Sequence, residues 1–343
     1  MNAPLSVETG PPAAAGALWY KDAIIYQVHI KSFFDANNDG VGDFPGLIAK
    51  LDYIAELGVS AIWLLPFYPS PLRDDGYDIS DYYNIHPAYG TLDDFKAFLG
   101  EARRRNIRVI TELVLNHTSD QHPWFQEALA DAPGTGAWRR FHCVRGRGDG
   151  GSEPPNSWQS VFSGPAWSQL PDADGQPSGW WYLHLFDSSQ PDVNWENPEV
   201  REDYERTLRF WFDRGIDGFR IDVATALTKP TDYPDAFYAD SVDGVDSELA
   251  SVVPYFDRDD VHEVWRSWRL VADEYDGDRA FVAEAWVDDV VRQAAYTRRD
   301  ELHTAFNFVA LHSPWDPQGL RKVISDSLDR SEERRVGKEC RSR

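Results

Sequence analysis

Short apolar runs alternate with amphipathic stretches along most of this chain. β-branched and aromatic residues dominate six runs that we interpret as strands, at residues 23–30, 61–66, 108–115, 216–224, 279–286 and 303–310. Apolar residues recur at helical spacing at 47–58, 91–106, 197–215 and 259–275, and Thr91 and Asn197 are suitable first residues for two of these helices. Strands that alternate with helices favour a parallel sheet. The pattern therefore predicts an α/β fold, a C-terminally truncated (β/α)8 barrel with about six of the eight strands.

The regular alternation stops between residues 118 and 194. This stretch is rich in Pro, Gly, Ser and Trp and shows no clear helical period. A structureless loop of that length is unusual in a compact domain, so we expect an inserted subdomain after the third strand. We divide the rest of the chain into a flexible lead-in (1–17), the first part of the barrel (18–117), its continuation (195–329) and a tail (330–343).

The tail differs from the preceding residues in charge. RSEERRVGKECRSR is basic and polar, whereas the chain as a whole has 57 acidic and 34 basic residues. The tail resembles translated vector or adapter sequence, so we expect it to be non-native. A natural basic tail is the alternative.

Composition narrows the partners and the compartment. The net charge of −23 argues against nucleic acid or an anionic membrane as the main partner. Two cysteines cannot form a disulfide framework or a zinc cluster. The sequence has neither the features of a signal peptide nor an apolar run of ~20 residues, so we expect a cytoplasmic protein without membrane contact. GRGDGG (146–151) follows no apolar strand, so we expect no organic cofactor.

One short polar segment has the spacing of a cation site. In DANNDGVGD, oxygen-bearing side chains stand at Asp35, Asn37, Asp39 and Asp43. An EF-hand calcium loop begins in this way, but its twelfth position needs a bidentate Glu, and here it is Gly46. The spacing alone is compatible with a calcium sensor, a structural calcium site or a plain turn.

Chemically reactive residues gather where the predicted strands end. His117 follows the third strand, and Arg220 and Asp222 lie on the fourth. Glu284 lies on the fifth. In a barrel, these carboxyl ends meet at one face. An Asp and a Glu about 5–5.5 Å apart suit a retaining glycosidase, with one as nucleophile and the other as acid/base.

Five segments together resemble the α-amylase family, glycoside hydrolase family 13. GVSAIWLLP, ELVLNH, QPDVN, GFRIDVA and AEAW occur in that order, and the resemblance covers residues 18–329. It implies Asp222 as nucleophile and Glu284 as general acid/base. It also implies that Arg220 holds the nucleophile ionised, because a guanidinium lowers the pKa of a nearby carboxylate.

The same resemblance assigns roles to three further residues and to the polar segment. His117 and Asp78 would hydrogen-bond the hydroxyls of the sugar to be cleaved, and Tyr77 would be its stacking platform. DANNDGVGD matches the calcium loop that follows the first strand in oligosaccharide-acting members. Structural Ca2+ is therefore expected, bound by the side chains of Asp35, Asn37, Asp39 and Asp43 and by the carbonyl of Val41.

The subgroup is divided between two likenesses. Up to about residue 125 the chain resembles trehalose synthases, which isomerise maltose. From about Trp138 onward it looks more like bacterial α-glucosidases, and a chimeric assembly of two genes is one explanation. Because residues 118–194 shape the substrate pocket, we expect a retaining α-glucosidase that acts on maltose or short α-gluco-oligosaccharides through a covalent glucosyl-enzyme. A maltose-to-trehalose isomerase is the first alternative, and an inactive fragment that binds calcium and sugar is the second.

Two departures from the family pattern bear on activity. Glu112 stands where most members have Asp, although trehalose synthase-like members often carry Glu. The family's third carboxylate lies in a His-Asp pair after the seventh strand, and this sequence contains no His-Asp pair. We therefore expect residues 1–343 by themselves to show little or no activity.

Overall fold

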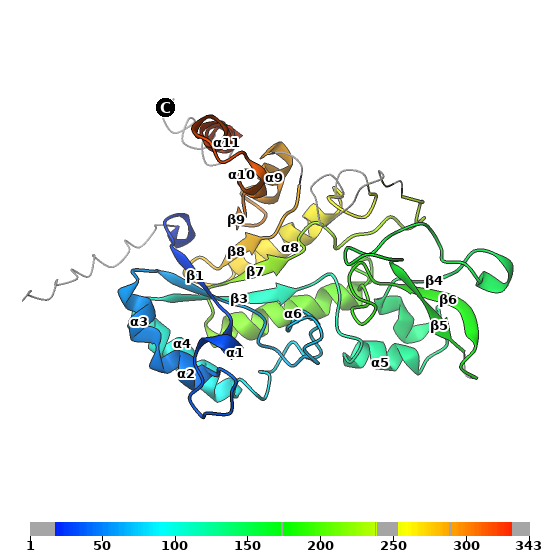
Figure 1. Cartoon of the computed structure of the whole chain (residues 1–343), viewed down its shortest axis with the longest axis horizontal. Coiled ribbons are helices and arrows are strands. Elements are labelled where there is room, and N and C mark those ends of the chain that lie inside the picture. The colour runs from blue at the N-terminus through cyan, green and yellow to red at the C-terminus, as the bar shows by residue number, and fades with distance from the viewer. Residues whose placement is uncertain (1–17, 173, 237, 239–252, 288–289, 331–343) are drawn as a thin grey trace, which may run out of the picture.

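The chain is built around one parallel sheet. The structure, a computed structural model, describes residues 18–172, 174–236, 238, 253–287 and 290–330. Six strands pair in the order β1-β2-β3-β7-β8-β9, and every neighbouring pair is parallel (Figure 1). Their bounds are Ile25–Val28 (β1), Ala61–Leu64 (β2), Arg108–Val114 (β3), Gly218–Asp222 (β7), Ala280–Ala283 (β8) and Thr304–Ala305 (β9). The predicted truncated (β/α)8 barrel is confirmed.

Helices connect these strands and cover the sheet. They are α2 (Phe44–Ala49), α3 (Leu51–Glu56), α4 (Leu92–Arg104), α6 (Pro198–Arg214) and α8 (Val261–Asp273). The Thr91 side chain accepts a hydrogen bond from the Asp94 N–H at the start of α4, and Asp94 caps the Thr91 N–H in return. The Asn197 side chain likewise accepts from the Glu199 N–H at the start of α6. Both predicted helix starts are confirmed.

Three predicted boundaries are wrong. The predicted helix 47–58 is two helices, because the backbone leaves the helical conformation at Lys50 (φ −108°, ψ 4°). The predicted strand 303–310 shortens to β9, because the Asn307 side chain accepts from the Ala310 N–H and so caps the short helix α10 (Phe308–His312). The predicted strand 23–30 shortens to β1, because a one-turn helix, α1 (Ile30–Phe33), begins at its last residue and lies between β1 and the polar segment DANNDGVGD.

Residues 118–194 contain a second sheet, of three antiparallel strands in the order β4-β6-β5. Figure 1 shows these strands and α5 at one side of the parallel sheet. The elements are α5 (Pro123–Leu129), η2 (Gly136–Arg140), β4 (Cys143–Arg145), η3 (Asp149–Gly151), β5 (Trp167–Pro171) and β6 (Pro177–Leu183). Our division of the chain at residues 118 and 194 stays a prediction.

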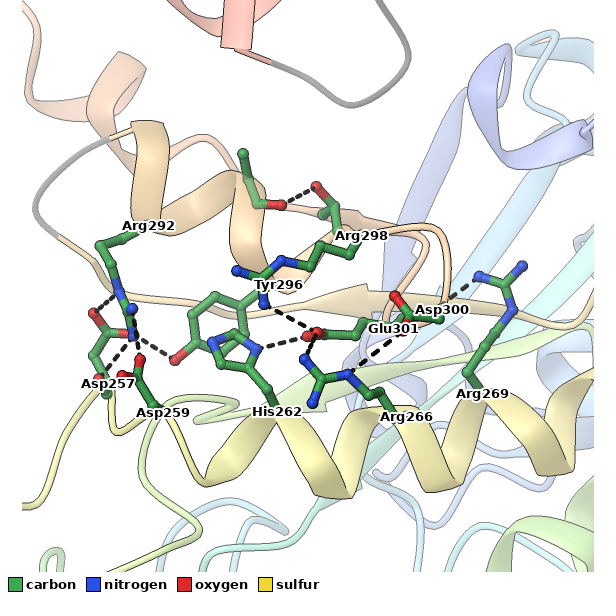
Figure 2. A network of polar contacts seen from close by, with 12 residues as sticks. Asp257, Asp259, His262, Arg266, Arg269, Arg292, Tyr296, Arg298, Asp300 and Glu301 are labelled. Atoms are coloured by element: carbon green, nitrogen blue, oxygen red, sulfur yellow. Dashed lines mark hydrogen bonds and ion pairs between the residues drawn. The ribbon is translucent and has the colours of Figure 1, made fainter. Parts of the chain in front are cut away.

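A polar network fastens α8 to the segment that follows β8 (Figure 2). On α8, His262 Nδ1 lies 2.6 Å from Glu301 Oε2, and the fully buried Glu301 also accepts from Arg266 at 2.9 Å. Ahead of α8, both Asp257 carboxylate oxygens accept from Arg292 at 2.8 Å. These bonds therefore tie α8 and the residues just before it to the segment that follows β8.

The remaining elements are one at the start of the described chain, one between β8 and β9, and one at its end. They are η1 (Trp19–Lys21), α9 (Val290–Tyr296) and α11 (Pro317–Arg330). The predicted lead-in (1–17) and all of the predicted tail except residue 330 lie outside the described residues. Within the part of the chain that the structure describes, no helix has the length and apolar character needed to cross a membrane.

Candidate active site

The carboxyl ends of β3, β7 and β8 bring three carboxylates to one guanidinium. Arg220 and Asp222 lie two residues apart on β7, so their side chains point to the same face of the sheet. Glu112 is the register partner of Arg220 on the neighbouring strand β3. Glu284 directly follows β8. The strand register thus places all four side chains at one end of the sheet.

Arg220 contacts each carboxylate directly. Its Nη1 donates to Asp222 Oδ1 at 2.6 Å and to Glu112 Oε1, and its Nη2 lies 2.7 Å from Glu284 Oε1. The Trp63 indole Nε1 donates to the other Glu112 oxygen at 2.7 Å. Asp222 is 7 % exposed and Glu112 is fully buried. The two carboxylates and the guanidinium predicted from the sequence therefore meet, and Glu112 joins them.

Burial makes Asp222 and Glu112 hold protons more strongly than exposed carboxylates do. Burial raises the pKa of Asp222 well above its usual range, and the nearby charge of Glu284 acts in the same direction. Burial also raises the pKa of Glu112 to about 7. Arg220 lowers the pKa of Asp222 and of Glu112, but burial outweighs it. The predicted role of Arg220 in holding the nucleophile ionised therefore stays a prediction. One guanidinium among three carboxylates favours a state in which the cluster retains a proton near neutral pH.

The backbone next to Asp222 also holds Glu284. Val223 has a φ of +45°, a conformation that is rare for a β-branched residue, and its N–H donates to Glu284 Oε2 at 3.0 Å. The Glu284 N–H donates to the Ile221 carbonyl at 2.9 Å, and the Ala224 N–H donates to the Glu284 carbonyl at 3.0 Å. Strained backbone of this kind is frequent at functional sites. Both ends of Glu284 are therefore fixed to the Asp222 segment.

β7 and β8 also approach closely at their other end. Gly218 is the register partner of Ala280, and a Cβ at residue 218 would stand 2.0 Å from the Ala280 carbonyl oxygen. Backbone cannot yield to such a contact without moving the strand. Glycine at this position therefore keeps the two strands that carry Asp222 and Glu284 side by side.

Tyr77 and His117 border the carboxylate cluster. Burial raises the pKa of Tyr77, and the charges of Glu112 and Asp222 act on it as well, which places its ring near them. His117 Nε2 lies 3.2 Å from the Tyr77 carbonyl oxygen, so this nitrogen donates when it carries a proton. Burial lowers the pKa of His117 to about 4, so the imidazole is neutral near pH 7. A neutral imidazole and a phenol ring can contact an uncharged sugar without adding charge.

Asp78 is fully buried beside Tyr77 and holds its own loop. One carboxylate oxygen accepts from the Ser70 hydroxyl at 2.7 Å, and the other accepts from the Arg73 N–H at 3.0 Å. The structure thus brings Asp78 to the same loop as Tyr77. Its predicted bond to a sugar hydroxyl stays a prediction.

A buried ion pair contacts Asn116, which lies beside the His117 ring, and the sequence analysis did not identify this pair. Lys229 Nζ lies 2.9 Å from Asp192 Oδ2 and donates to Asn116 Oδ1 at 2.7 Å. Both charged side chains have no exposed area. The signal for Asp192 was present in the segment QPDVN, and a single Lys within the apolar run after Asp222 was the signal for Lys229. Their pairing joins two segments that are distant in sequence, so no local pattern predicts it.

The polar segment DANNDGVGD lies apart from this cluster, in the loop between α1 and α2. Asp35 accepts from the N–H groups of Asn37, Asn38 and Gly40, and Asp39 accepts from the Val41 N–H. Asp43 is buried and caps α2 through the Gly46 N–H.

The chemistry of this loop fits a hard cation, because carboxylate and amide oxygens suit Ca2+. Its oxygens here accept backbone hydrogen bonds, and no group of three or more His, Cys, Asp or Glu residues gathers to hold a metal among the described residues. Calcium binding therefore stays a prediction.

Comparisons with known proteins bear on the family of the whole chain. The chain matches the profile of the alpha-amylase catalytic domain over residues 27–325. It is 47 % identical over 218 residues to an oligo-1,6-glucosidase of Parageobacillus thermoglucosidasius, covering 64 % of this chain and 37 % of that protein. It is 40 % identical over 325 residues to a trehalose-6-phosphate hydrolase of Bacillus subtilis strain 168, covering 90 % and 54 %.

A solved structure is similar to this chain over most of its length. The crystal structure of an α-glucosyl transfer enzyme, XgtA, superposes with a TM-score of 0.81 at 36 % identity, covering 92 % of this chain and 59 % of that one. The chain spans about half the length of the relatives it matches, or less. Because the catalytic-domain profile covers most of its residues, the chain belongs to the α-amylase family.

Proposed function

We propose that this site cleaves α-glucosidic bonds with retention of configuration, acting on maltose or short α-gluco-oligosaccharides. One observation carries the proposal: Asp222 and Glu284 share the guanidinium of Arg220 at the carboxyl ends of neighbouring strands. Both carboxyl groups therefore face the same small volume. A retaining glycosidase needs two carboxyl groups close together in this way.

In the first step Asp222 attacks the anomeric carbon of the glucose unit. The bond from that carbon to the leaving oxygen breaks while Glu284 gives its proton to the oxygen. The product is a glucosyl ester of Asp222 and a free sugar. In the second step Glu284 takes a proton from water, the water oxygen attacks the anomeric carbon, and Asp222 leaves as a carboxylate.

The surroundings support this division of roles. The Val223 N–H and Arg220 hold Glu284 at both carboxylate oxygens, so it stays oriented through both proton transfers. Glu112 binds the same guanidinium nitrogen as Asp222, and Trp63 in turn donates to Glu112. Preorganised charges of this kind stabilise a developing oxocarbenium ion without rearrangement.

Glucosyl transfer to a sugar hydroxyl is the second candidate. The superposable XgtA structure is named for α-glucosyl transfer, and the first half of the mechanism is common to hydrolysis and transfer. An isomerase differs only in keeping the released glucose as the acceptor in place of water. The named relatives also include a hydrolase of a phosphorylated substrate, trehalose 6-phosphate. A fragment that binds sugar and calcium without turnover is the third candidate.

Product analysis separates these candidates. The chain is incubated with maltose, isomaltose and trehalose, and sugars are resolved by chromatography, with Asp222→Asn and Glu284→Gln as near-isosteric variants. Glucose alone, lost in both variants, is expected for hydrolysis. New disaccharides identify transfer. Binding of maltose to the Asp222→Asn variant without turnover by the parent chain would leave only the binding role.

We also propose that the loop at residues 35–43 binds Ca2+ as a structural ion. Its donors would be the side chains of Asp35, Asn37, Asp39 and Asp43 and the Val41 carbonyl, and the ion would stiffen the connection between α1 and α2. The alternating oxygen donors support this proposal.

A further inference from the structure

Among the described residues, four cations in the active-site cluster and in the segments next to it are bound to carboxylates. Arg220 binds three carboxylates, and Lys229 is paired with Asp192. Arg73, whose N–H bonds Asp78, carries a guanidinium whose Nη1 lies 2.6 Å from Asp120 Oδ2. Lys31 is paired with Asp75. The positive charge of these four side chains is therefore already neutralised.

Carboxylates reach the edge of the sugar-contacting residues. Gln190 Nε2 donates to Asp74 Oδ2 at 2.7 Å and lies 3.2 Å from His117 Nε2. Burial raises the pKa of Asp74, and the charges of Asp78, Asp187 and Asp75 act in the same direction. Apart from Asp75, which is paired with Lys31, three acidic side chains thus lie close together here: Asp74, Asp78 and Asp187. A further negative charge placed there would be repelled.

The charge of the whole chain has the same sign. Acidic residues outnumber basic ones by 57 to 34, which leaves a net charge of −23. A field of this sign acts over a longer range than those individual carboxylates. An anionic ligand is therefore disfavoured both at a distance and on contact.

We propose that the site accepts uncharged α-glucosides and rejects those whose leaving sugar carries a phosphate. This inference rests on the proposed α-glucosidase function and narrows its substrate class. A phosphate monoester carries about −1.5 to −2 charges at neutral pH and is held in proteins by unpaired Arg or Lys side chains or by helix N-termini. Here Arg73, the cation on the loop that ends in Tyr77 and Asp78, is occupied by Asp120.

Binding to the inactive Asp222→Asn chain tests the proposal without requiring turnover. Calorimetry compares maltose with maltose phosphorylated at the 6-hydroxyl of its reducing glucose, and 6-O-methylmaltose controls for the size of the substituent. We expect the phosphorylated sugar to bind about tenfold or more weaker than the methylated one. Adding salt should reduce the difference in affinity between the two sugars, because salt screens exposed charges.

A charge variant sharpens the test. Asp120→Asn in the same background removes the partner of Arg73, so affinity for the phosphorylated sugar rises while that for maltose stays unchanged. Asp326→Asn, which breaks the exposed pair with Lys322, is the matched control, and it should change neither the affinity for the phosphorylated sugar nor that for maltose.

The outcomes separate the inference from the proposed function. If the phosphorylated sugar binds as tightly as 6-O-methylmaltose, the inference is overturned while the α-glucosidase proposal stands. If no maltose derivative binds, the proposed function falls and the inference falls with it.

Discussion

Replacement of Lys229 by methionine provides a quantitative test of the buried ion pair with Asp192. The two charged atoms are 2.9 Å apart and neither side chain is exposed. Methionine matches the length of the lysine stem but cannot bond Asp192 or Asn116. The Asp192 carboxylate would keep its bond from the Leu185 N–H at 2.8 Å and lose its counter-ion.

Two magnitudes decide the expected effect. At 2.9 Å the Coulomb attraction is about 6 kcal/mol with an effective dielectric constant of ~20. Desolvating the two ions costs several kcal/mol each, so the intact pair is close to neutral for stability. Removing one partner leaves the other buried and unpaired, which costs about 3–5 kcal/mol. The Lys229→Met chain should lose that amount of its free energy of unfolding.

Urea unfolding followed by tryptophan fluorescence and by circular dichroism measures this loss. The double variant Lys229→Met/Asp192→Asn should recover about half of it or more, because the uncompensated charge is gone. Lys322→Met breaks an exposed pair with Asp326 and should cost about 0–1 kcal/mol. Equal, small losses for Lys229→Met and Lys322→Met would refute the account of a buried, uncompensated carboxylate.

Three further predictions concern other parts of the chain. Burial lowers the pKa of His122, which caps α5 through the Trp124 N–H, to about 4. The unfolded chain therefore binds more protons than the folded chain between about pH 6.5 and 4. The free energy of unfolding should fall by up to about 3 kcal/mol as the pH drops across that window, and His122→Asn should lack this contribution. Ca2+ at about 100 times its dissociation constant should stabilise the chain by about 2.7 kcal/mol in thermal unfolding, and Asp35→Asn/Asp39→Asn should abolish the response; no shift in the parent chain would exclude the calcium site. Gly218→Ala should separate β7 from β8 and lower both stability and any glucose release, whereas Gly100→Ala, inside α4, should stabilise by about 0.5–1 kcal/mol; equal effects in unfolding experiments would contradict the close approach.

Much of the parallel sheet could be predicted because its strands are nearly all apolar and end in polar residues. Arg220, Asp222 and Glu284 were identifiable for the same reason, since the carboxyl ends of parallel strands meet at one edge. Helix starts at Thr91 and Asn197 were readable because capping chemistry is local. The assignments that succeeded depend on residues within a few positions of each other.

The features that the sequence analysis did not predict depend on tertiary structure. The antiparallel sheet pairs Cys143 with Tyr182, too distant in sequence for a hairpin signal. The left-handed conformation of Val223 goes against the preference of a β-branched residue and is imposed by its surroundings. Local periodicity shows neither, because each depends on contacts between distant segments.

The Lys229–Asp192 pair also limits how this fold can exchange its parts. Asp192 lies near the end of the 118–194 stretch, and Lys229 follows β7. Their buried ion pair therefore joins this stretch to the parallel sheet. If recombination imports residues 118–194 from a relative and position 229 holds no lysine, the Asp192 carboxylate is left buried without a counter-ion. A library that shuffles this stretch should therefore keep positions 192 and 229 from the same parent.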